Sequence, residues 1–355
     1  MALALTLARR GLGRVWPNPA VGCVIVGQDG NIVGRGWTQD GGRPHAETEA
    51  LRRAADAARG ATAYVSLEPC AHHGQTGPCA EALIAAGVAR VVSATEDPDA
   101  RVAGQGHAKL RAAGIAVEIG VRAAEARRVN EGFFARVLNR RPSITLKLAT
   151  TLDGKIALPS GASRWITGER AREHVHLLRA QHDAVMVGVG TALADDPELN
   201  CRLPALGPKR NPRIVVDSLA RLPGTSKLAK TAREQPVWLL TAAVQAASAL
   251  AVQGVEVLPV PATQQGLDLS AALNTLAERG LTRVLVEGGA TLAASLLAAD
   301  LVDHVLWYRA PTIMGEGLAA LASMNVSDLG ALPRFHHVET MRLGQDMLET
   351  YRRAP

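Results

Sequence analysis

A histidine, a glutamate and two cysteines lie close together in the first quarter of the chain. His45 and Glu47 are two residues apart in "PHAETEALRRA", and Cys70 and Cys79 are nine apart in "EPCAHHGQTGPC". Zinc in proteins takes four tetrahedral ligands, and a catalytic site uses three protein ligands and leaves the fourth position to water. His45, Cys70 and Cys79 are therefore candidate zinc ligands.

A zinc ion at this place has two possible uses, and the pattern favours the catalytic one. His72, or its neighbour His73, could close the site as a structural centre. A structural zinc needs no glutamate at position 47, however, and the order His-x-Glu, Pro-Cys, Cys is typical of zinc deaminases, in which the glutamate is not a ligand. Such a zinc lowers the pKa of a water molecule to about 7. We expect Glu47 to carry the proton to the ring nitrogen and the leaving ammonia.

Two glycine-containing turns mark a second chemical region in the other half of the chain. "VMVGVGTALADDP" holds Gly188 and Gly190, and "VLVEGGATLAASLL" holds Glu287, Gly288 and Gly289. Glycines between a strand and a helix let backbone amides approach a phosphate. Neither stretch has the full Gly-x-Gly-x-x-Gly dinucleotide pattern. The two turns together nevertheless suggest a phosphorylated cofactor or substrate.

The elements that carry these residues alternate between strand and helix patterns, which predicts an α/β fold in both halves. The basic, proline-containing stretch at 140–142 separates the halves, and we predict domains at 1–141 and 142–355. Helices are expected at 45–60 and 78–88, each ended by a glycine. The expected strands are 20–26, 31–37, 62–68 and 89–95 in the first half, where 103–120 adds one more helix and strand, and 143–150, 183–190, 212–218, 236–242, 254–260, 282–289 and 303–311 in the second.

Composition narrows the class of protein. The chain has 355 residues, 47% of them apolar, and a net charge of +6. The positive charge favours an anionic partner, but it is spread thinly, so we expect phosphorylated small molecules rather than nucleic acid. We expect neither a signal peptide nor a membrane span, and four cysteines do not make a disulfide framework. Cys23 reads as a core residue, Cys201 has no local partner, and a cytoplasmic location is expected.

The first half resembles the deaminase half of the bifunctional riboflavin-biosynthesis family, diaminohydroxyphosphoribosylaminopyrimidine deaminase / 5-amino-6-(5-phosphoribosylamino)uracil reductase. The motifs that carry the resemblance are "PNPAVGCVIV", "PHAE", "GATAYVSLEPCAHHGQTGPC", "ALIAAGVARVV", "EDPD" and "VAGQG". Most cytidine-type deaminases have Pro-Cys-x-x-Cys, and the longer insertion is the form found in this family. The resemblance implies a cytidine-deaminase-like mixed sheet with helices on both faces, one zinc ion on His45, Cys70 and Cys79, and Glu47 as proton carrier. It also implies that Asn18, His72 and the glycine-containing insertion hold the substrate.

The second half resembles the reductase half of the same family, whose fold is similar to dihydrofolate reductase. The motifs are "KLATTLDGKIA", "SRWITG", "LLRAQHDAVMVGVGTALADDPELNCR", "RIVVDS" and "VEGGATLAASLL". The resemblance implies NADPH bound by Ala149, Trp165, Thr191, Asp195, Ser218, Gly289, Ala290, Thr291, Leu292, Ala293, Ala294 and Ser295. It implies a phosphoribosyl substrate bound by Ser163, Arg179, Leu199, Arg202 and Glu287. Lys147 and Asp153 are alternative proton donors.

The resemblance implies a two-step reaction. The first half would deaminate 2,5-diamino-6-(5-phosphoribosylamino)pyrimidin-4-one, and the second would reduce the ribosyl group of 5-amino-6-(5-phosphoribosylamino)uracil to ribityl. A homo-oligomer, either a dimer or a tetramer, is expected. Two other functions remain open from the residues alone. One is a nucleic-acid or free-nucleobase deaminase with a non-catalytic second domain, and the other is a zinc-stabilised binding protein without activity.

Overall fold

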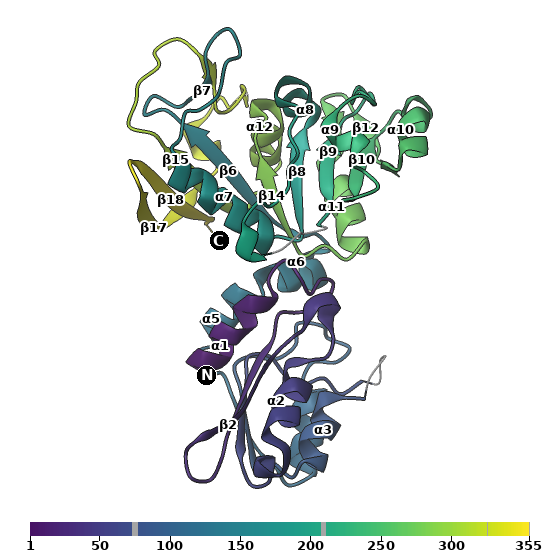
Figure 1. Cartoon of the computed structure of the whole chain (residues 1–355), viewed down its shortest axis with the longest axis vertical. Coiled ribbons are helices and arrows are strands. Elements are labelled where there is room, and N and C mark those ends of the chain that lie inside the picture. Colours follow the sequence, from purple (N-terminus) through teal and green to yellow (C-terminus); the bar gives the residue numbers. More distant parts are fainter. Residues whose placement is uncertain (73–76, 207–210, 325, 355) are drawn as a thin grey trace. The chain divides into compact units, whose positions relative to one another are not determined.

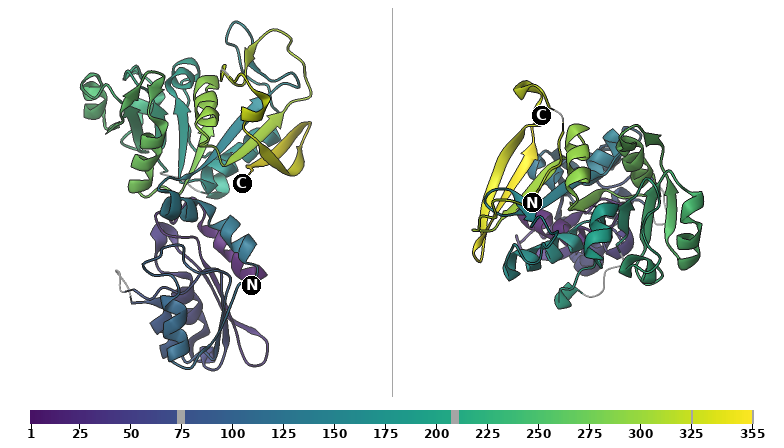
Figure 2. Two further views of the ribbon diagram at one scale, coloured as in Figure 1. Left: turned by 180° about the vertical axis from the view of Figure 1, so that it is seen from behind. Right: turned by 90° about the horizontal axis from the view of Figure 1, so that it is seen from above.

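The chain folds into two compact units, Met1–Arg140 and Arg141–Pro355 (Figures 1 and 2). The structure is a computed structural model that describes residues 1–72, 77–206, 211–324 and 326–354. None of the helices in these ranges is long and apolar enough to cross a membrane. The two units are described separately below.

The first unit is built on a five-stranded mixed sheet with the order β2-β1-β3-β4-β5. Its first three strands in that order are antiparallel and the last two add in parallel. The strands are β1 Gly22–Val26, β2 Ile32–Trp37, β3 Thr62–Val65, β4 Arg90–Ser93 and β5 Ala116–Ile119. The helices are α1 Ala2–Ala8, α2 Ala46–Ala54, α3 Cys79–Ala85, α4 Gln105–Ala112, α5 Ala123–Val129 and α6 Glu131–Asn139.

Helices cover both faces of this sheet because successive side chains of β1 point to opposite sides. Cys23 and Ile25 are buried in one core cluster with α2 and α3. Val24, between them, packs with Ala4 and Leu7 of α1 on the other face. The expected mixed sheet with helices on both faces is thus confirmed, and Cys23 is the core residue that its apolar neighbours predict.

Two glycines of β2 fix the helix that carries His45 and Glu47. A Cβ atom at Gly36 would lie 2.1 Å from the Ala46 carbonyl oxygen, and one at Gly34 would lie 2.3 Å from that of Ala50. Real side chains cannot be placed so close, so only glycine lets α2 rest directly on the strand. These close contacts therefore fix the distance between the start of α2 and the sheet.

The second unit is built on a nine-stranded sheet with the order β11-β10-β9-β8-β14-β6-β15-β18-β17. It is parallel from β11 to β15, and β18 and β17 add as an antiparallel pair. The strands are β6 Ser143–Thr150, β8 Ala184–Gly188, β9 Arg213–Val216, β10 Val237–Thr241, β11 Glu256–Pro259, β14 Arg283–Glu287, β15 His304–Arg309, β17 Phe335–Leu343 and β18 Asp346–Arg353. Two small sheets pair β7 Lys155–Ala157 with β16 Leu318–Ala319, and β12 Ala262–Thr263 with β13 Gly266–Leu267.

The helices of this unit are α7 Glu169–Gln181, α8 Val189–Asp195, α9 Lys227–Lys230, α10 Ser248–Gln253, α11 Leu269–Glu278 and α12 Ala290–Ala298. Each strand expected from the sequence is present, which confirms an α/β fold in both halves. One expectation needs correction, and one pair of strands was missed. The helix expected at 45–60 ends as an α-helix at Ala54 and continues as a short 3-10 turn. The terminal pair β17 and β18 was not expected, because β17 is largely exposed and shows no apolar alternation.

Candidate functional site

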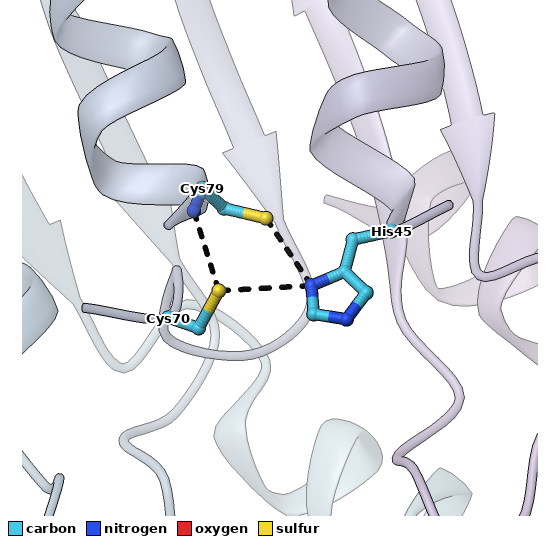
Figure 3. Close-up of side chains that lie close together, drawn as sticks. All are labelled: His45, Cys70 and Cys79. Carbon is cyan, nitrogen blue, oxygen red and sulfur yellow. Dashed lines mark hydrogen bonds between the residues drawn. The ribbon is translucent and has the colours of Figure 1, made fainter. Parts of the chain in front are cut away.

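His45, Cys70 and Cys79 meet at one point in the first unit. His45 immediately precedes α2, Cys70 lies in the loop after β3, and Cys79 is the first residue of α3. Their ligand atoms all lie within 4.8 Å of one another, and among the described residues they form a group that could hold a metal ion. Figure 3 shows the Nδ1 atom of His45 facing both sulfur atoms.

The spacing of these atoms fits a zinc ion. A nitrogen at about 2.1 Å and a sulfur at about 2.3 Å from a tetrahedral zinc stand about 3.6 Å apart. His45 Nδ1 lies 3.6 Å from the sulfur of Cys70 and 3.3 Å from that of Cys79. One histidine and two cysteines are also a donor set that suits zinc. Among the described residues, these three therefore supply donor atoms with N–S spacings that fit three ligands of a zinc ion.

The surroundings of Cys70 favour the thiolate form that binds metal. The backbone N–H of Cys79 donates a hydrogen bond to the Cys70 sulfur over 3.3 Å. The Cys79 thiol and the His45 ring also bond to this sulfur and hold the pKa of Cys70 at about 4. The hydrogen bond between the two cysteine side chains raises the pKa of Cys79. Cys70 is therefore the thiolate of the pair, and Cys79 stays protonated. A thiolate beside a histidine nitrogen provides two ligands that can bind a metal cation.

Glu47 lies in the first turn of α2, next to the three ligands and outside their group. Its side chain is buried, and it is close enough to Cys79 to share a hydrogen bond with the thiol. Burial, and secondarily the charge of Cys70, raises the pKa of Glu47 to about 7. A carboxyl group in this state can both take up and release a proton near neutral pH.

Glu68, which sequence reasoning missed, holds the loop before Cys70 in place. Its buried carboxylate accepts hydrogen bonds from the backbone N–H groups of Asp97, Gly104 and Gly106, over 3.1, 2.9 and 2.9 Å. These bonds tie the loop that carries Cys70 to the segment before α4 and to the first turn of α4. A charged residue between a buried strand and a metal ligand is the signal that could have identified it.

Asn18 and His72 lie in different surroundings. The side-chain amide of Asn18 packs against Gly42, where a Cβ atom would lie 1.9 Å from Asn18 Nδ2, so Asn18 borders the loop that leads into His45. His72 is exposed and is not part of the ligand group. His73 and the rest of the stretch 73–76 lie outside the described residues.

The second unit contains a cleft of about 1490 Å³. Its lining comes from the carboxyl ends of β6, β14, β8 and β9 and from the segments that follow them. This is the edge at which parallel α/β sheets bind their ligands. Single small-ligand sites have volumes of about 300–1000 Å³, so the cleft has room for a cofactor and a substrate together.

Most of the residues expected to bind NADPH line this cleft. They are Ala149, Trp165, Thr191, Asp195, Ser218, Gly289, Ala290, Thr291, Leu292 and Ser295. Ala293 and Ala294 do not line it, because they lie on the buried side of α12. Gly289 has a φ of +90°, and a Cβ atom there would lie 3.3 Å from the Thr191 hydroxyl oxygen. The turn before α12 consists of glycines, and the absence of side chains lets a phosphate approach its backbone.

All five residues expected to bind the substrate also line the cleft: Ser163, Arg179, Leu199, Arg202 and Glu287. Arg179 and Glu287 form a two-pronged ion pair, with Nε to Oε1 at 2.6 Å and Nη2 to Oε2 at 2.8 Å. Burial alone would raise the pKa of Glu287, but Arg179 lowers it. Arg179 also donates to the Asn200 carbonyl oxygen. Most of its hydrogen-bonding capacity is therefore used within the protein.

The two alternative proton donors lie in different places. Lys147 lines the cleft and pairs in register with Glu287 on the adjacent strand. Burial lowers the pKa of Lys147, although Glu287 partly opposes this effect. Asp153 does not line the cleft. It accepts hydrogen bonds from Thr151 and from the backbone N–H groups of Met314 and Gly315, and these bonds lower its pKa to about 2.

Comparisons with known proteins match both units. Residues 1–95 match the cytidine and deoxycytidylate deaminase zinc-binding region, and residues 142–348 match the RibD C-terminal domain. The riboflavin biosynthesis protein RibD of Escherichia coli (strain K12) is 44% identical, over 98% of this chain and 96% of its own length. RibD of Aquifex aeolicus is 40% identical, over 99% and 97%.

Solved structures agree over the full length. Acinetobacter baumannii RibD superposes with a TM-score of 0.89 at 38% identity, covering 100% of this chain and 98% of that one. The deaminase/reductase of Thermotoga maritima superposes with a TM-score of 0.87 at 36% identity, covering 100% and 97%. A zinc-binding deaminase region and a reductase domain thus follow each other in one chain. The chain belongs to the RibD family of bifunctional deaminases and reductases of riboflavin biosynthesis.

Proposed function

We propose that the chain catalyses two consecutive steps of riboflavin biosynthesis. The first is hydrolytic deamination of 2,5-diamino-6-(5-phosphoribosylamino)pyrimidin-4-one, and the second is NADPH-dependent reduction of the ribosyl group of the product to ribityl. Glu47 carries this proposal, because it is a buried carboxyl group beside three zinc ligands without being one of them. A purely structural zinc centre would not require it.

In the deaminase unit His45, Cys70 and Cys79 would hold the zinc. When bound, zinc activates a water molecule for attack on the ring carbon that bears the amino group. Glu47 takes a proton from this water and passes it to the ring nitrogen and the departing amine, so that water and the aminopyrimidine become the oxo product and ammonia. Asn18 and His72 hold the substrate beside the ligands, and Glu68 keeps the Cys70 loop in position.

In the reductase unit the residues that line the cleft, among them the turn at Gly289, would hold NADPH. NADPH supplies a hydride for C1′ of the ring-opened, imine-like ribosyl group. Lys147 supplies the proton, because it lines the cleft whereas Asp153 is ionised and turned to a backbone loop. Glu287 and Arg179 orient Lys147 and the ribosyl chain, and Arg202 receives the phosphate. The protein mainly positions the two reactants and neutralises charge.

The remaining assignments extend the same proposal. We assign the zinc-dependent deaminase to 1–141 and the NADPH-dependent reductase to 142–355, which agrees with the matched ranges. We also propose a cytoplasmic location and a homo-oligomer, a dimer or a tetramer. The exposed strand β17 at the end of the nine-stranded sheet, with Val338 and Met341 exposed, offers an edge for association of copies.

The proposal is tested by following ammonia release and NADPH oxidation separately with the full chain and the diaminopyrimidine ribosyl phosphate. We expect ammonia release without NADPH, and NADPH oxidation only after deamination. The wild-type chain is compared with Glu47→Gln. Ammonia release by Glu47→Gln at the wild-type rate would exclude a catalytic carboxyl group, and the absence of NADPH oxidation with the deaminated substrate would exclude the reductase.

A further inference from the structure

Lys147 has a different neighbour on each of the two strands that flank β6. It is in register with Glu287 of β14 and with Leu306 of β15. Tyr308 lies on the same face of β15 as Leu306, and Lys147 Nζ is 5.9 Å from the centre of the Tyr308 ring. An ammonium group within about 6 Å of an aromatic ring is attracted by the negative charge of the ring face. The ammonium group of Lys147 thus has a carboxylate on one side and an aromatic ring on the other.

A single helix, α7, fixes both of these neighbours. Arg179 of α7 forms the two-pronged ion pair with Glu287. His174, one turn earlier in the same helix, shares a hydrogen bond of 2.6 Å between its Nδ1 atom and the Tyr308 hydroxyl group. The apolar side of α7 packs in one core cluster with β14, β15 and β18, and Figure 1 shows it beside β6. The same helix therefore places the carboxylate and the ring relative to Lys147.

Tyr308 acts on its neighbours from the core and has no place in the cleft itself. It is only 1% exposed and does not line the cleft, whereas Lys147 does. Burial, and secondarily the charge of Glu287, raises the pKa of Tyr308, so its hydroxyl group stays protonated. Burial lowers the pKa of His174, which keeps its ring neutral at neutral pH. Neither residue therefore adds a positive charge that would repel the ammonium group.

Lys147 needs a favourable neighbour because its surroundings oppose the charged form. Burial lowers its pKa and Arg179 adds to this effect, whereas Glu287 and Asp195 act in the opposite direction. The ring of Tyr308 favours the ammonium form as the two carboxylates do, but it carries no net charge. A further carboxylate in this place would repel a phosphorylated substrate, and a neutral ring does not.

We propose that Tyr308, oriented by His174, is a positioning residue of the reductase that keeps the side chain of Lys147 in the cleft as an ammonium group. The inference rests on the proposed role of Lys147 as proton donor and adds a residue to that step. Tyr308 takes no part in the proton transfer. Without its ring, Lys147 loses one of the two contacts that hold its side chain, and it loses its proton at a lower pH.

The kinetic test compares the wild-type full-length chain with Tyr308→Phe, which keeps the ring, and with Tyr308→Leu, which removes it. Both variants lose the hydrogen bond to His174, so the difference between them isolates the ring. With saturating NADPH and deaminated substrate, we expect the fall of kcat at high pH to stay in place in Tyr308→Phe. In Tyr308→Leu it should move about one pH unit lower, and kcat at neutral pH should fall about tenfold with KM within about twofold. A wild-type pH profile in Tyr308→Leu overturns the inference.

Leu348→Ala is the matched control for loss of core packing. Leu348 is in register with Tyr308 and belongs to the same core cluster. The control should lower the unfolding temperature of the reductase unit and leave the pH profile in place. A profile that moves as far as that of Tyr308→Leu would assign the effect to packing and overturn the inference. If Tyr308→Leu does not fold, 3,4,5-trifluorophenylalanine at position 308 keeps the ring but removes the negative charge of its face, and it should move the profile in the same direction.

A direct titration of Lys147 separates this inference from the proposed function. The chain has six lysines, so carbon-13 NMR of the full-length chain labelled at lysine Cε gives few signals, and Lys147→Met identifies the one from Lys147. We expect the pKa of Lys147 to be lower in Tyr308→Leu than in wild type and in Tyr308→Phe. Equal values in all three overturn the inference even if the enzyme oxidises NADPH. A lower pKa without a matching change in the kinetic profile supports the contact inferred here and contradicts the proposed role of Lys147 as proton donor.

Discussion

Arg179 of α7 and Glu287 of β14 lie face to face in the reductase cleft, joined by two hydrogen bonds of 2.6 and 2.8 Å. Their side chains are only 14% and 10% exposed. Each residue therefore compensates a charge that the other could not bury alone. The pair connects α7 to β14, the strand next to Lys147. The same contact therefore contributes to the stability of the unit and to the geometry of its cleft.

Breaking this pair is predicted to cost stability and reduction together. Glu287→Met leaves the Arg179 guanidinium buried without its carboxylate, and such a loss costs about 3–5 kcal/mol. We expect calorimetric unfolding of the reductase unit at lower temperature, loss of NADPH oxidation, and unchanged ammonia release. The double variant Arg179→Met/Glu287→Met should recover part of the stability but not the reduction. A double variant as unstable as the single one would show that the pair is not the source of the loss.

Glu47→Gln is predicted to separate metal binding from deamination. The amide keeps the size of the side chain but cannot carry a proton, so ammonia release should fall about 10²–10⁴-fold. Zinc content, measured by atomic absorption, should stay at the wild-type level because Glu47 is outside the ligand group. Reduction of the deaminated substrate serves as the internal control and should not change. Loss of zinc from this variant would instead make Glu47 a ligand.

Removal of the metal is predicted to affect one activity only. Cys70→Ser and Cys79→Ser each take away a sulfur ligand, and we expect loss of zinc and of ammonia release in both. Cys201→Ser is the matched control, since Cys201 belongs to the second unit and is a free cysteine. It should retain zinc and both activities. NADPH oxidation with the deaminated substrate should persist in all three variants, and its loss on zinc removal would contradict independent sites.

Much of the fold and the three zinc ligands could be predicted from the sequence, because both follow from local patterns. Short runs rich in valine, isoleucine and leucine identified the buried strands. The His-x-Glu and Pro-Cys motifs identified the ligands, which the structure brings within 4.8 Å. Strand β17 was not predicted, because nearly all of its residues are exposed and it has no alternation of buried and exposed side chains.

Relationships between distant residues could not be predicted. Arg179 was expected to face the substrate, and it does line the cleft, but its partner Glu287 is 108 residues away. No periodicity links two such positions. Glu68 was missed for the same reason, because its carboxylate bonds to backbone groups 29 to 38 residues further along. Side chains that act on a folded neighbour leave no spacing rule in the sequence.

The pH dependence of reduction is predicted to follow Lys147. Burial lowers its pKa from the ordinary value of about 10.4, and in the proposed mechanism the ammonium form donates the proton. Reduction should therefore be constant at low and neutral pH and fall as pH rises through this lowered pKa. Lys147→Met should reduce kcat strongly and remove the fall. Asp153→Asn is the control, and its profile should match wild type; a shifted basic limb there would make Asp153 part of the proton transfer.

The last prediction concerns Gly36, on which the position of the deaminase residues depends. Gly36→Ala would bring a Cβ atom within 2.1 Å of the Ala46 carbonyl oxygen, so α2 must move away from β2. Because His45 and Glu47 lie at the start of α2, we expect lower zinc affinity, lower ammonia release and a lower unfolding temperature of the deaminase unit. Arg35→Ala, the exposed neighbour on the other face of β2, is the control and should change none of these. Wild-type zinc binding by Gly36→Ala would show that the contact between strand and helix does not set the geometry of the site.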